Sequence, residues 1–151
     1  MCPAVRGGFY EVRAQYIETL PIPTATEEQK QTIAKLAELC QQAAEACYKQ
    51  QKKLRDTIPS LHPNKRVEKL STALQNWWKL DFAAFQTQIK KEFKQDIPVK
   101  ERGVWKEMLE TGAQEIERLT LEIAKHEREL NAAVYALFNL TPEEIALIER
   151  G

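Results

Sequence analysis

The residues best suited to do chemistry are seven basic side chains around one corner of the chain. Four end a predicted first helix and three follow a short linker: Lys49, Lys52, Lys53, Arg55, Lys65, Arg66 and Lys69. Lysine and arginine side chains grouped in this way are typical of sites that contact phosphates. Five of them are therefore candidate DNA-binding residues, namely Lys52, Lys53, Lys65, Arg66 and Lys69. The alternative is that these charged side chains only keep this corner of the protein solvated and bind no DNA.

The charge of the chain is uneven, although 22 basic and 22 acidic residues cancel. Residues 49–106 contain fourteen basic and six acidic residues, a net charge of +8, whereas residues 1–48 carry −2 and residues 107–151 carry −6. The whole molecule has no net field to attract nucleic acid or an anionic membrane. Only the basic middle, residues 49–106, carries the net positive charge needed to attract nucleic acid.

Signatures of catalysis and of cofactor binding are absent from the sequence. It has no glycine-rich phosphate loop, no Gly-x-Ser-x-Gly motif and no Cys-x-x-Cys pair. Asp81, Glu92 and Lys94 have the residue types of a metal-dependent nuclease, but we expect them on a solvated helix face and not on the strands that such a site needs. We predict no catalytic, cofactor-binding or metal-binding residue, and no enzymatic activity.

Aromatic, histidine and cysteine side chains have structural explanations. One indole of the adjacent Trp77 and Trp78 should face the core, a role we favour over stacking on bases. His126 occupies an apolar position of a helix, where a polar residue with a local partner is more common than a switch. Cys40 and Cys47 would lie about 10 Å apart along one helix, too far for a disulfide, so we expect two buried thiols.

Long helices are predicted by the scarcity of chain-breaking residues. The 5 glycines and 7 prolines leave three long stretches free of either type: 24–58, 64–97 and 113–141. Each is much longer than a typical strand, which excludes a sandwich, a barrel or a Rossmann-type alternation. No apolar run approaches the roughly 18 residues of a membrane span, so we expect a soluble, cytoplasmic chain.

Two of these stretches carry heptad patterns of apolar residues. The first should begin at a Thr26–Gln29 capping box and end at Thr57, before Pro59. The second should run from residue 101 or 104 to residue 138. Their matching lengths and patterns predict an antiparallel pair. In this pair Ile33, Leu36 and Leu54 would face Ile116, Leu119, Ile123 and Leu130.

The remaining elements are short. We expect a helical region over residues 66–95, broken near Asp81, and a final helix that starts at a Thr141–Glu144 capping box with Pro142 at its first position. The pattern of residues 9–13 predicts a short strand that has no sheet of its own. We expect this strand to be either frayed or paired with another molecule across an interface. The predicted fold is therefore all-α: a long antiparallel coiled-coil hairpin with additional packed helices and a short extended N-terminal segment. Residues 1–23 would form an arm or the end of an upstream recognition domain, and residues 24–151 a helical spacer domain.

Two parts of the sequence resemble known families of restriction-modification proteins. Residues 15–23, QYIETLPIP, resemble the junction in specificity subunits, including those of type I systems, where a target-recognition domain ends and a helical spacer begins. Residues 74–82, LQNWWKLDF, with residues 100–105, KERGVW, and residues 129–145, ELNAAVYALFNLTPEEI, resemble the C-terminal end of large adenine-specific DNA methyltransferases. These methyltransferases are the fused type IIG restriction-methylase family and its phage-defence relatives.

The resemblance implies a helical C-terminal part of a DNA-recognition region, which positions a recognition domain relative to a catalytic core. The family's Asn-Pro-Pro-aromatic motif is absent, so no catalytic role transfers to any residue. The implied partners are DNA, bound weakly and without sequence preference, and a methyltransferase or restriction catalytic domain or subunit. A homodimer is possible on this interpretation, and no membrane is involved. The rival interpretation is a helical assembly module that joins protein partners without touching DNA.

Overall fold

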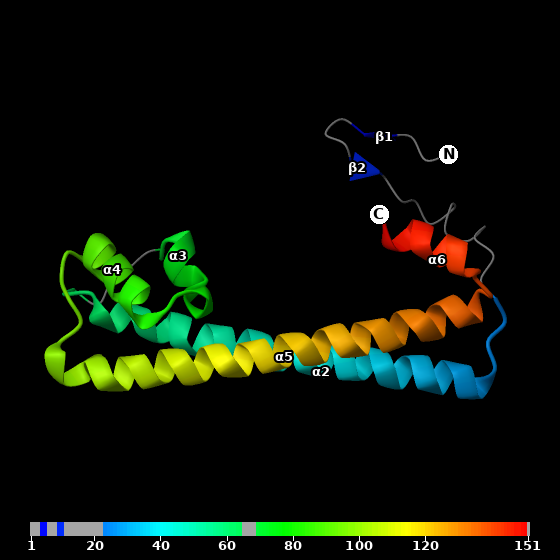
Figure 1. The fold of residues 1–151 in the computed structure, drawn as a ribbon, viewed down its shortest axis with the longest axis horizontal. Coiled ribbons are helices and arrows are strands. Elements are labelled where there is room, and N and C mark those ends of the chain that lie inside the picture. Colours follow the sequence, from blue (N-terminus) through cyan, green and yellow to red (C-terminus); the bar gives the residue numbers. More distant parts are fainter. Residues whose placement is uncertain (1–3, 6–8, 11–22, 65–68, 151) are drawn as a thin grey trace.

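Two long helices form the body of the protein. The computed structural model describes residues 4–5, 9–10, 23–64 and 69–150. Helices α2 (Glu27–Thr57) and α5 (Arg102–Leu137) lie antiparallel along each other, with short helices between them in the chain (Figure 1). This arrangement confirms the predicted all-α fold with a long helical hairpin. None of the helices described here is long and apolar enough to cross a membrane.

Local capping explains where the long first helix and the short last helix begin. Thr26 Oγ1 accepts a hydrogen bond from Gln29 N at 3.2 Å, and Gln29 Oε1 accepts one from Thr26 N at 2.9 Å. Thr141 and Glu144 form the same reciprocal pair at the start of α6 (Pro142–Glu149). Each box satisfies backbone N–H groups that the helix itself leaves unpaired. Both predicted capping boxes are confirmed.

Short elements between the long helices fold back onto one end of the hairpin. In chain order they are η1 (Ile58–Leu61), α3 (Thr72–Gln75), η2 (Trp77–Lys79), α4 (Phe82–Phe93) and η3 (Val99–Glu101). We call residues 49–106 the head, and residues 23–48 with 107–150 the shaft. Asp81 Oδ1 accepts from Ala84 N at 2.7 Å, which confirms the break and the cap before α4. Over residues 69–80 the predicted helix before Asp81 is instead the short helix α3 and the 3-10 helix η2, because Asn76 leaves helical geometry. Residues 66–68 of that prediction lie outside the described residues.

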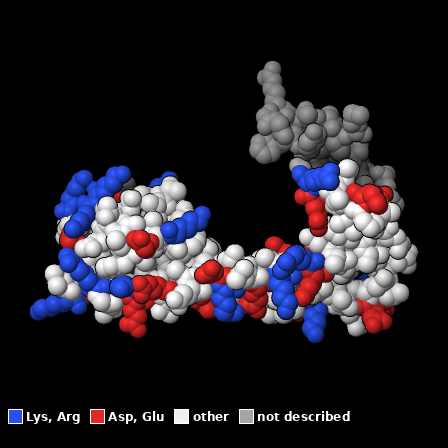
Figure 2. Space-filling model, viewed as in Figure 1, with Lys and Arg blue, Asp and Glu red and all other residues white. Residues whose placement is uncertain are grey.

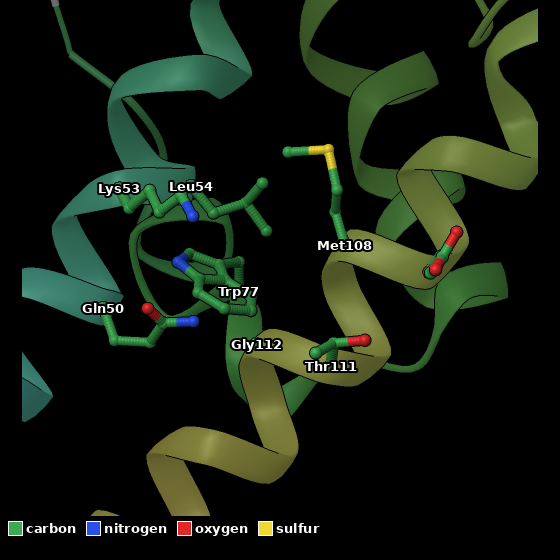
Figure 3. A pocket seen from close by; sticks show the side chains of 8 residues that line it. Gln50, Lys53, Leu54, Trp77, Met108, Thr111 and Gly112 are labelled. Atoms are coloured by element: carbon green, nitrogen blue, oxygen red, sulfur yellow. The ribbon is translucent and has the colours of Figure 1, made fainter.

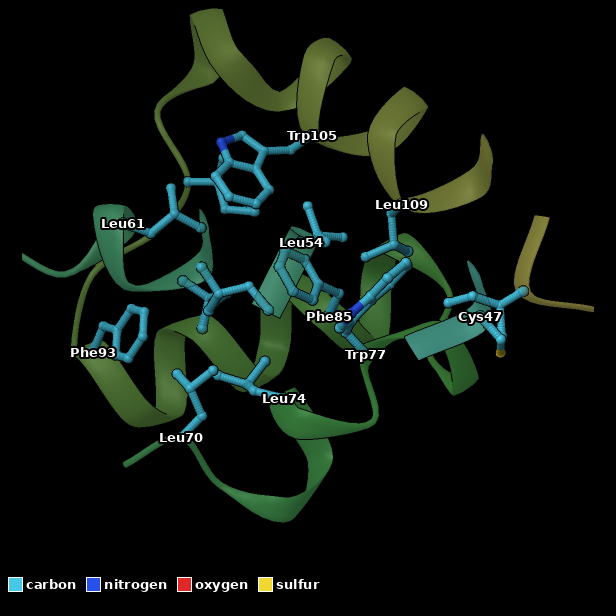
Figure 4. Packing of buried hydrophobic residues seen from close by; sticks show 14 of the residues in the cluster. Cys47, Leu54, Leu61, Leu70, Leu74, Trp77, Phe85, Phe93, Trp105 and Leu109 are labelled. Carbon is cyan, nitrogen blue, oxygen red and sulfur yellow. The ribbon is translucent and has the colours of Figure 1, made fainter. Parts of the chain in front are cut away.

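The hydrophobic core lies in the head and the adjoining part of the shaft (Figure 4). The largest fully buried side chains are Trp77, Phe85, Ile58, Leu74, Ile89, Ile97 and Leu109. Every described residue that is buried falls between Ala43 and Leu119. Here the short helices add a third layer over α2 and α5, which two helices alone cannot supply.

The predicted seam is buried only near the head. Leu54, Ile116 and Leu119 are buried, whereas the predicted contacts at the other end are half-buried: Ile33, Leu36, Ile123 and Leu130. The antiparallel register places Leu54 in one cleft with Met108 and Gly112, and Ile33 in another with Ala133 and Ala136. Leu54 therefore lies across from the residues just before Ile116.

The N-terminal strand has a partner within its own chain. Strand β1 (Ala4–Val5) pairs antiparallel with β2 (Phe9–Tyr10), with Ala4 opposite Tyr10 and Val5 opposite Phe9. The expectation of fraying or of pairing across an interface is thus wrong for Phe9 and Tyr10, because a strand just upstream supplies the backbone partners. Residues 11–13 of the predicted strand lie outside the described residues.

Candidate nucleic-acid interface

Basic side chains gather over the head, as Figure 2 shows for the end of the molecule where α3 and α4 lie. Of the five candidate residues, Lys52 and Lys53 are exposed near the end of α2, and Lys69 is exposed before α3. Lys65 and Arg66 lie outside the described residues. Lys52 is also 3.8 Å from Asp56, one turn along α2. An exposed pair of this kind contributes little to stability and leaves the lysine accessible.

Arg55 belongs to the fold and not to the exposed basic surface. Its Nε and Nη2 atoms donate to the Gln75 carbonyl oxygen at 3.2 and 3.0 Å. Its guanidinium carbon also lies 5.8 Å from the centre of the Trp78 ring. Arg55 thereby ties α2 to α3 and η2, and its side chain is already engaged by groups within the head.

Carboxylates of the head are also engaged by the fold. Glu92 accepts from both the backbone N and the Oγ of Ser71, at 2.6 and 2.7 Å, so it anchors the start of α3 to α4. The expectation of a solvated face at Glu92 is therefore wrong. Asp81, as described, caps α4. Glu92 and Asp81 are thus engaged within the head.

Asp96 has the densest set of partners among these carboxylates. Gln86 Nε2 donates to it at 2.6 Å, and Lys90 Nζ and Arg102 Nη2 lie at 2.9 and 2.8 Å. The hydrogen bond from Gln86, followed by that from Lys90, lowers the pKa of Asp96 from 3.8 to about 2. This carboxylate links α4 to the start of α5, and it stays ionised under all ordinary conditions.

Several lysines of the head point outward. Within the described part of the head, seven exposed lysines form no ion pair with a described residue: Lys49, Lys53, Lys69, Lys79, Lys91, Lys94 and Lys100. They come from α2, the segment before α3, η2, α4 and the turns beside α4 and α5. Four of them, Lys79, Lys91, Lys94 and Lys100, were missed as site residues by the sequence analysis. The excess charge of residues 49–106 was the signal that could have found them.

The tryptophans pack inside the head. Trp77 is fully buried and donates from Nε1 to the Gln51 carbonyl oxygen at 3.0 Å. Trp78 meets the Trp77 ring edge-on at 5.9 Å, besides the Arg55 contact. Trp105 stacks on Phe85 at 5.9 Å. The prediction that one of Trp77 and Trp78 faces the core is confirmed, and these contacts favour packing over base stacking.

A small cleft lies where the head meets the shaft (Figure 3). It measures about 260 Å³ and is lined by Gln50, Lys53, Leu54, Trp77, Glu107, Met108, Thr111 and Gly112. Trp77 packs so closely on Gly112 that a Cβ there would lie 2.7 Å from Trp77 Cη2. The lining brings together no set of catalytic groups. In the described part of the chain, no three His, Cys, Asp or Glu side chains are placed to hold a metal ion.

His126 and the two cysteines of α2 lie in the shaft. His126 is largely buried, with Nε2 3.8 Å from Glu122 and Nδ1 3.6 Å from Glu129. It shares a shallow cleft with Leu39 on α2, so its predicted seam position is confirmed. Both cysteines have free thiols: Cys47 is buried as predicted, whereas Cys40 is only half-buried. Neither region adds a site for chemistry.

The chain matches one known family model. Residues 26–134 match a family described as a domain of unknown function (DUF8810). The matched region contains the head and nearly all of the paired helices, and it ends before α6. No curated protein and no solved structure matches the chain.

Proposed function

The chain belongs to the DUF8810 family, and we propose that it is a helical spacer of a DNA target-recognition region whose basic head contacts DNA phosphates. One observation carries the proposal. Glu92 and Asp96 join elements of the head and Asp81 caps α4, while seven of the ten described lysines of the head are exposed and form no ion pair with a described residue. The sequence of the head, residues 49–106, carries a net charge of +8, and the rest of the chain carries −8. Clustered positive charge of this kind attracts the phosphate backbone.

The shaft suits the role of a spacer. Helix α5 has 36 residues, which corresponds to about 54 Å at 1.5 Å per residue. A paired helical rod of this length can hold a recognition domain at a set distance from a methyltransferase or restriction catalytic core. The resemblance of residues 74–82, 100–105 and 129–145 to the C-terminal end of type IIG enzymes supports this role. The chain would contribute no catalysis of its own.

The expected binding mode is contact with the DNA backbone and not reading of bases. Lysine ammonium groups act as flexible point charges, whereas base recognition needs bidentate or aromatic contacts. The tryptophans of the head are engaged within it. Binding of the isolated chain should therefore be independent of sequence, with a dissociation constant of about 10⁻⁶ to 10⁻⁴ M at physiological salt.

The test is fluorescence anisotropy with labelled duplex DNA across a range of salt concentrations. A head variant carries Lys53→Glu, Lys69→Glu and Lys79→Glu. The logarithm of the association constant should fall linearly with the logarithm of salt, with a slope of about 0.9 per phosphate contacted. The head variant should bind at least about tenfold more weakly and show a smaller slope. Circular dichroism should show unchanged helical content.

A shaft variant with the same change of charge is the matched control. It carries Lys35→Glu, Lys125→Glu and Arg150→Glu, all exposed and outside the head. It should keep most of the affinity of the natural chain. Equal loss in both variants would show that only total charge matters and would overturn the head as the site. A chain that binds no DNA at low salt would overturn the proposed function.

The assembly module is the second candidate, and one observation favours it. The seam is only half-buried at the end of the shaft far from the head, where Phe138, Leu147 and Ile148 are exposed. Exposed apolar surface of this kind marks protein contacts. This candidate predicts no salt-sensitive DNA binding, together with a stable complex with a protein partner.

A further inference from the structure

Among the described residues, the shaft is incompletely covered at its outer end, which we define as residues 27–42 and residues 120–149, a range that includes α6. No described residue of this region is buried, although the heptad pattern continues through it. Leu147 is 76% exposed, Ile148 53% and Phe138 47%. A groove of about 540 Å³ lies between α5 and α6, with Tyr135, Leu140 and Ile145 in its lining. Near the head a third layer covers the same seam, whereas the described residues form no corresponding buried layer at the outer end.

Charge complementarity indicates what covers it. The shaft, residues 23–48 and 107–150, carries a net charge of −8, and the head carries +8. Acidic side chains at the outer end include Glu127, Glu143 and Glu149, all exposed. The outer end is acidic and also exposes apolar side chains. The surface that matches it best is therefore basic and exposes apolar side chains of its own. The head of a second copy has both, because Val99 is 75% and Val104 59% exposed among its lysines.

We propose that two copies of this chain associate head to tail, with the head of each packed on the outer end of the other's shaft. Head and outer end lie at opposite ends of one elongated molecule (Figure 1). An antiparallel pair therefore makes both complementary contacts at once, related by a two-fold axis across the shafts. A parallel pair would instead bring two heads of +8 together. The proposal concerns self-association without DNA and does not rest on the proposed function.

Sedimentation of the purified chain tests the association. At about 0.1 M salt, where charges act over about 10 Å, the mass should approach twice the 17.4 kDa of one chain as concentration rises. At about 1 M salt the range falls to about 3 Å, and the dimer should weaken at least about tenfold. A chain that stays monomeric at every concentration in low salt would overturn the proposal.

A variant in which head and shaft carry smaller opposite charges, here called the polarity variant, distinguishes head-to-tail attraction from an effect of total charge. It combines Lys79→Glu and Lys91→Glu in the head with Glu127→Lys and Glu149→Lys at the outer end of the shaft. The net charge stays at zero, but the head falls to +4 and the shaft to −4. Because attraction follows the product of the two charges, it falls about fourfold. The dimer should weaken at least about tenfold.

The matched control exchanges charge within the shaft, through Lys35→Glu with Glu127→Lys. It leaves the charges of head and shaft unchanged and should dimerise as the natural chain does. If the polarity variant dimerises as strongly as this control, the proposal is wrong. Carbodiimide cross-linking of mixed light and heavy isotope chains then gives the orientation. Links between copies should join head lysines to outer-end glutamates, and links confined to two heads or to two outer ends would contradict the arrangement.

Discussion

Replacement of Gly112 by alanine should destabilise the protein, although alanine is the better helix former. The added Cβ would lie 2.7 Å from Trp77 Cη2 and 3.2 Å from Cζ3. Ordinary contact begins near 3.4 Å, so the ring or α5 must move by more than half an ångström. Trp77 has little freedom to move, because it is fully buried and held to Gln51 through Nε1.

Three contributions set the change in the free energy of unfolding: two destabilise the variant and one stabilises it. Overpacking of a filled core costs about 1 to 3 kcal/mol. Loss or stretching of the Trp77 hydrogen bond adds about 0.5 to 1.5 kcal/mol. Alanine recovers about 1 kcal/mol of helix propensity relative to glycine. The expected net effect of Gly112→Ala is a loss of about 0.5 to 3.5 kcal/mol in the free energy of unfolding.

Gly103→Ala is a control on the same helix. Nothing lies within 4 Å of a Cβ at Gly103, so this change should be neutral or stabilising by up to about 1 kcal/mol. Urea unfolding followed by circular dichroism measures both variants. A double-mutant cycle with Trp77→Phe isolates the contact, since the smaller ring removes the clashing edge and Gly112→Ala should then cost less. If Gly112→Ala proves as stable as Gly103→Ala, the close packing of α5 on Trp77 is refuted.

Two further predictions concern an ion pair and the core. The pKa of Asp96 is lowered on folding, so its ionised form stabilises the protein above about pH 3.8, and this stabilisation disappears as the pH falls toward about 2. Asp96→Asn should therefore lower stability at neutral pH, and the difference from the natural chain should vanish near pH 2; a difference independent of pH would contradict the ion pair. Leu109→Ala, at a position 1% exposed, should cost about 2 to 5 kcal/mol, whereas Leu130→Ala in the half-buried seam should cost clearly less. Equal losses in urea unfolding would show that the outer seam is as well packed as the core.

Helix boundaries could be predicted from the sequence because they depend on neighbouring residues. The Thr26–Gln29 and Thr141–Glu144 boxes and the stop before Pro59 are local effects, and the structure has them where the pattern places them. The heptad pattern likewise predicted that α2 and α5 would pair. It could not show that Ile33 and Leu130 are only half-buried, because periodicity gives the direction of a face and not what lies against it.

The candidate site was predicted only in part for a similar reason. Lysines close in sequence to Lys52 could be grouped by inspection, whereas Lys79, Lys91 and Lys100 join them only through the folding of the head. Arg55 looked like a member of the cluster, but its hydrogen bonds to Gln75 assign it to the fold. Adjacent tryptophans indicated one inward ring, and only the packing on Gly112 identified it as Trp77.

The confinement of the core to residues 43–119 gives the shaft a graded stiffness. Segments with few buried contacts open locally at a lower free energy than the global unfolding transition. Amide hydrogens of α2 and α5 should therefore exchange slowly beside the head and progressively faster toward Glu27 and Leu137. A domain attached at that end would move relative to the head, because the ends of α2 and α5 there open locally. The inner half of the helical rod would hold its direction, whereas the outer half would bend.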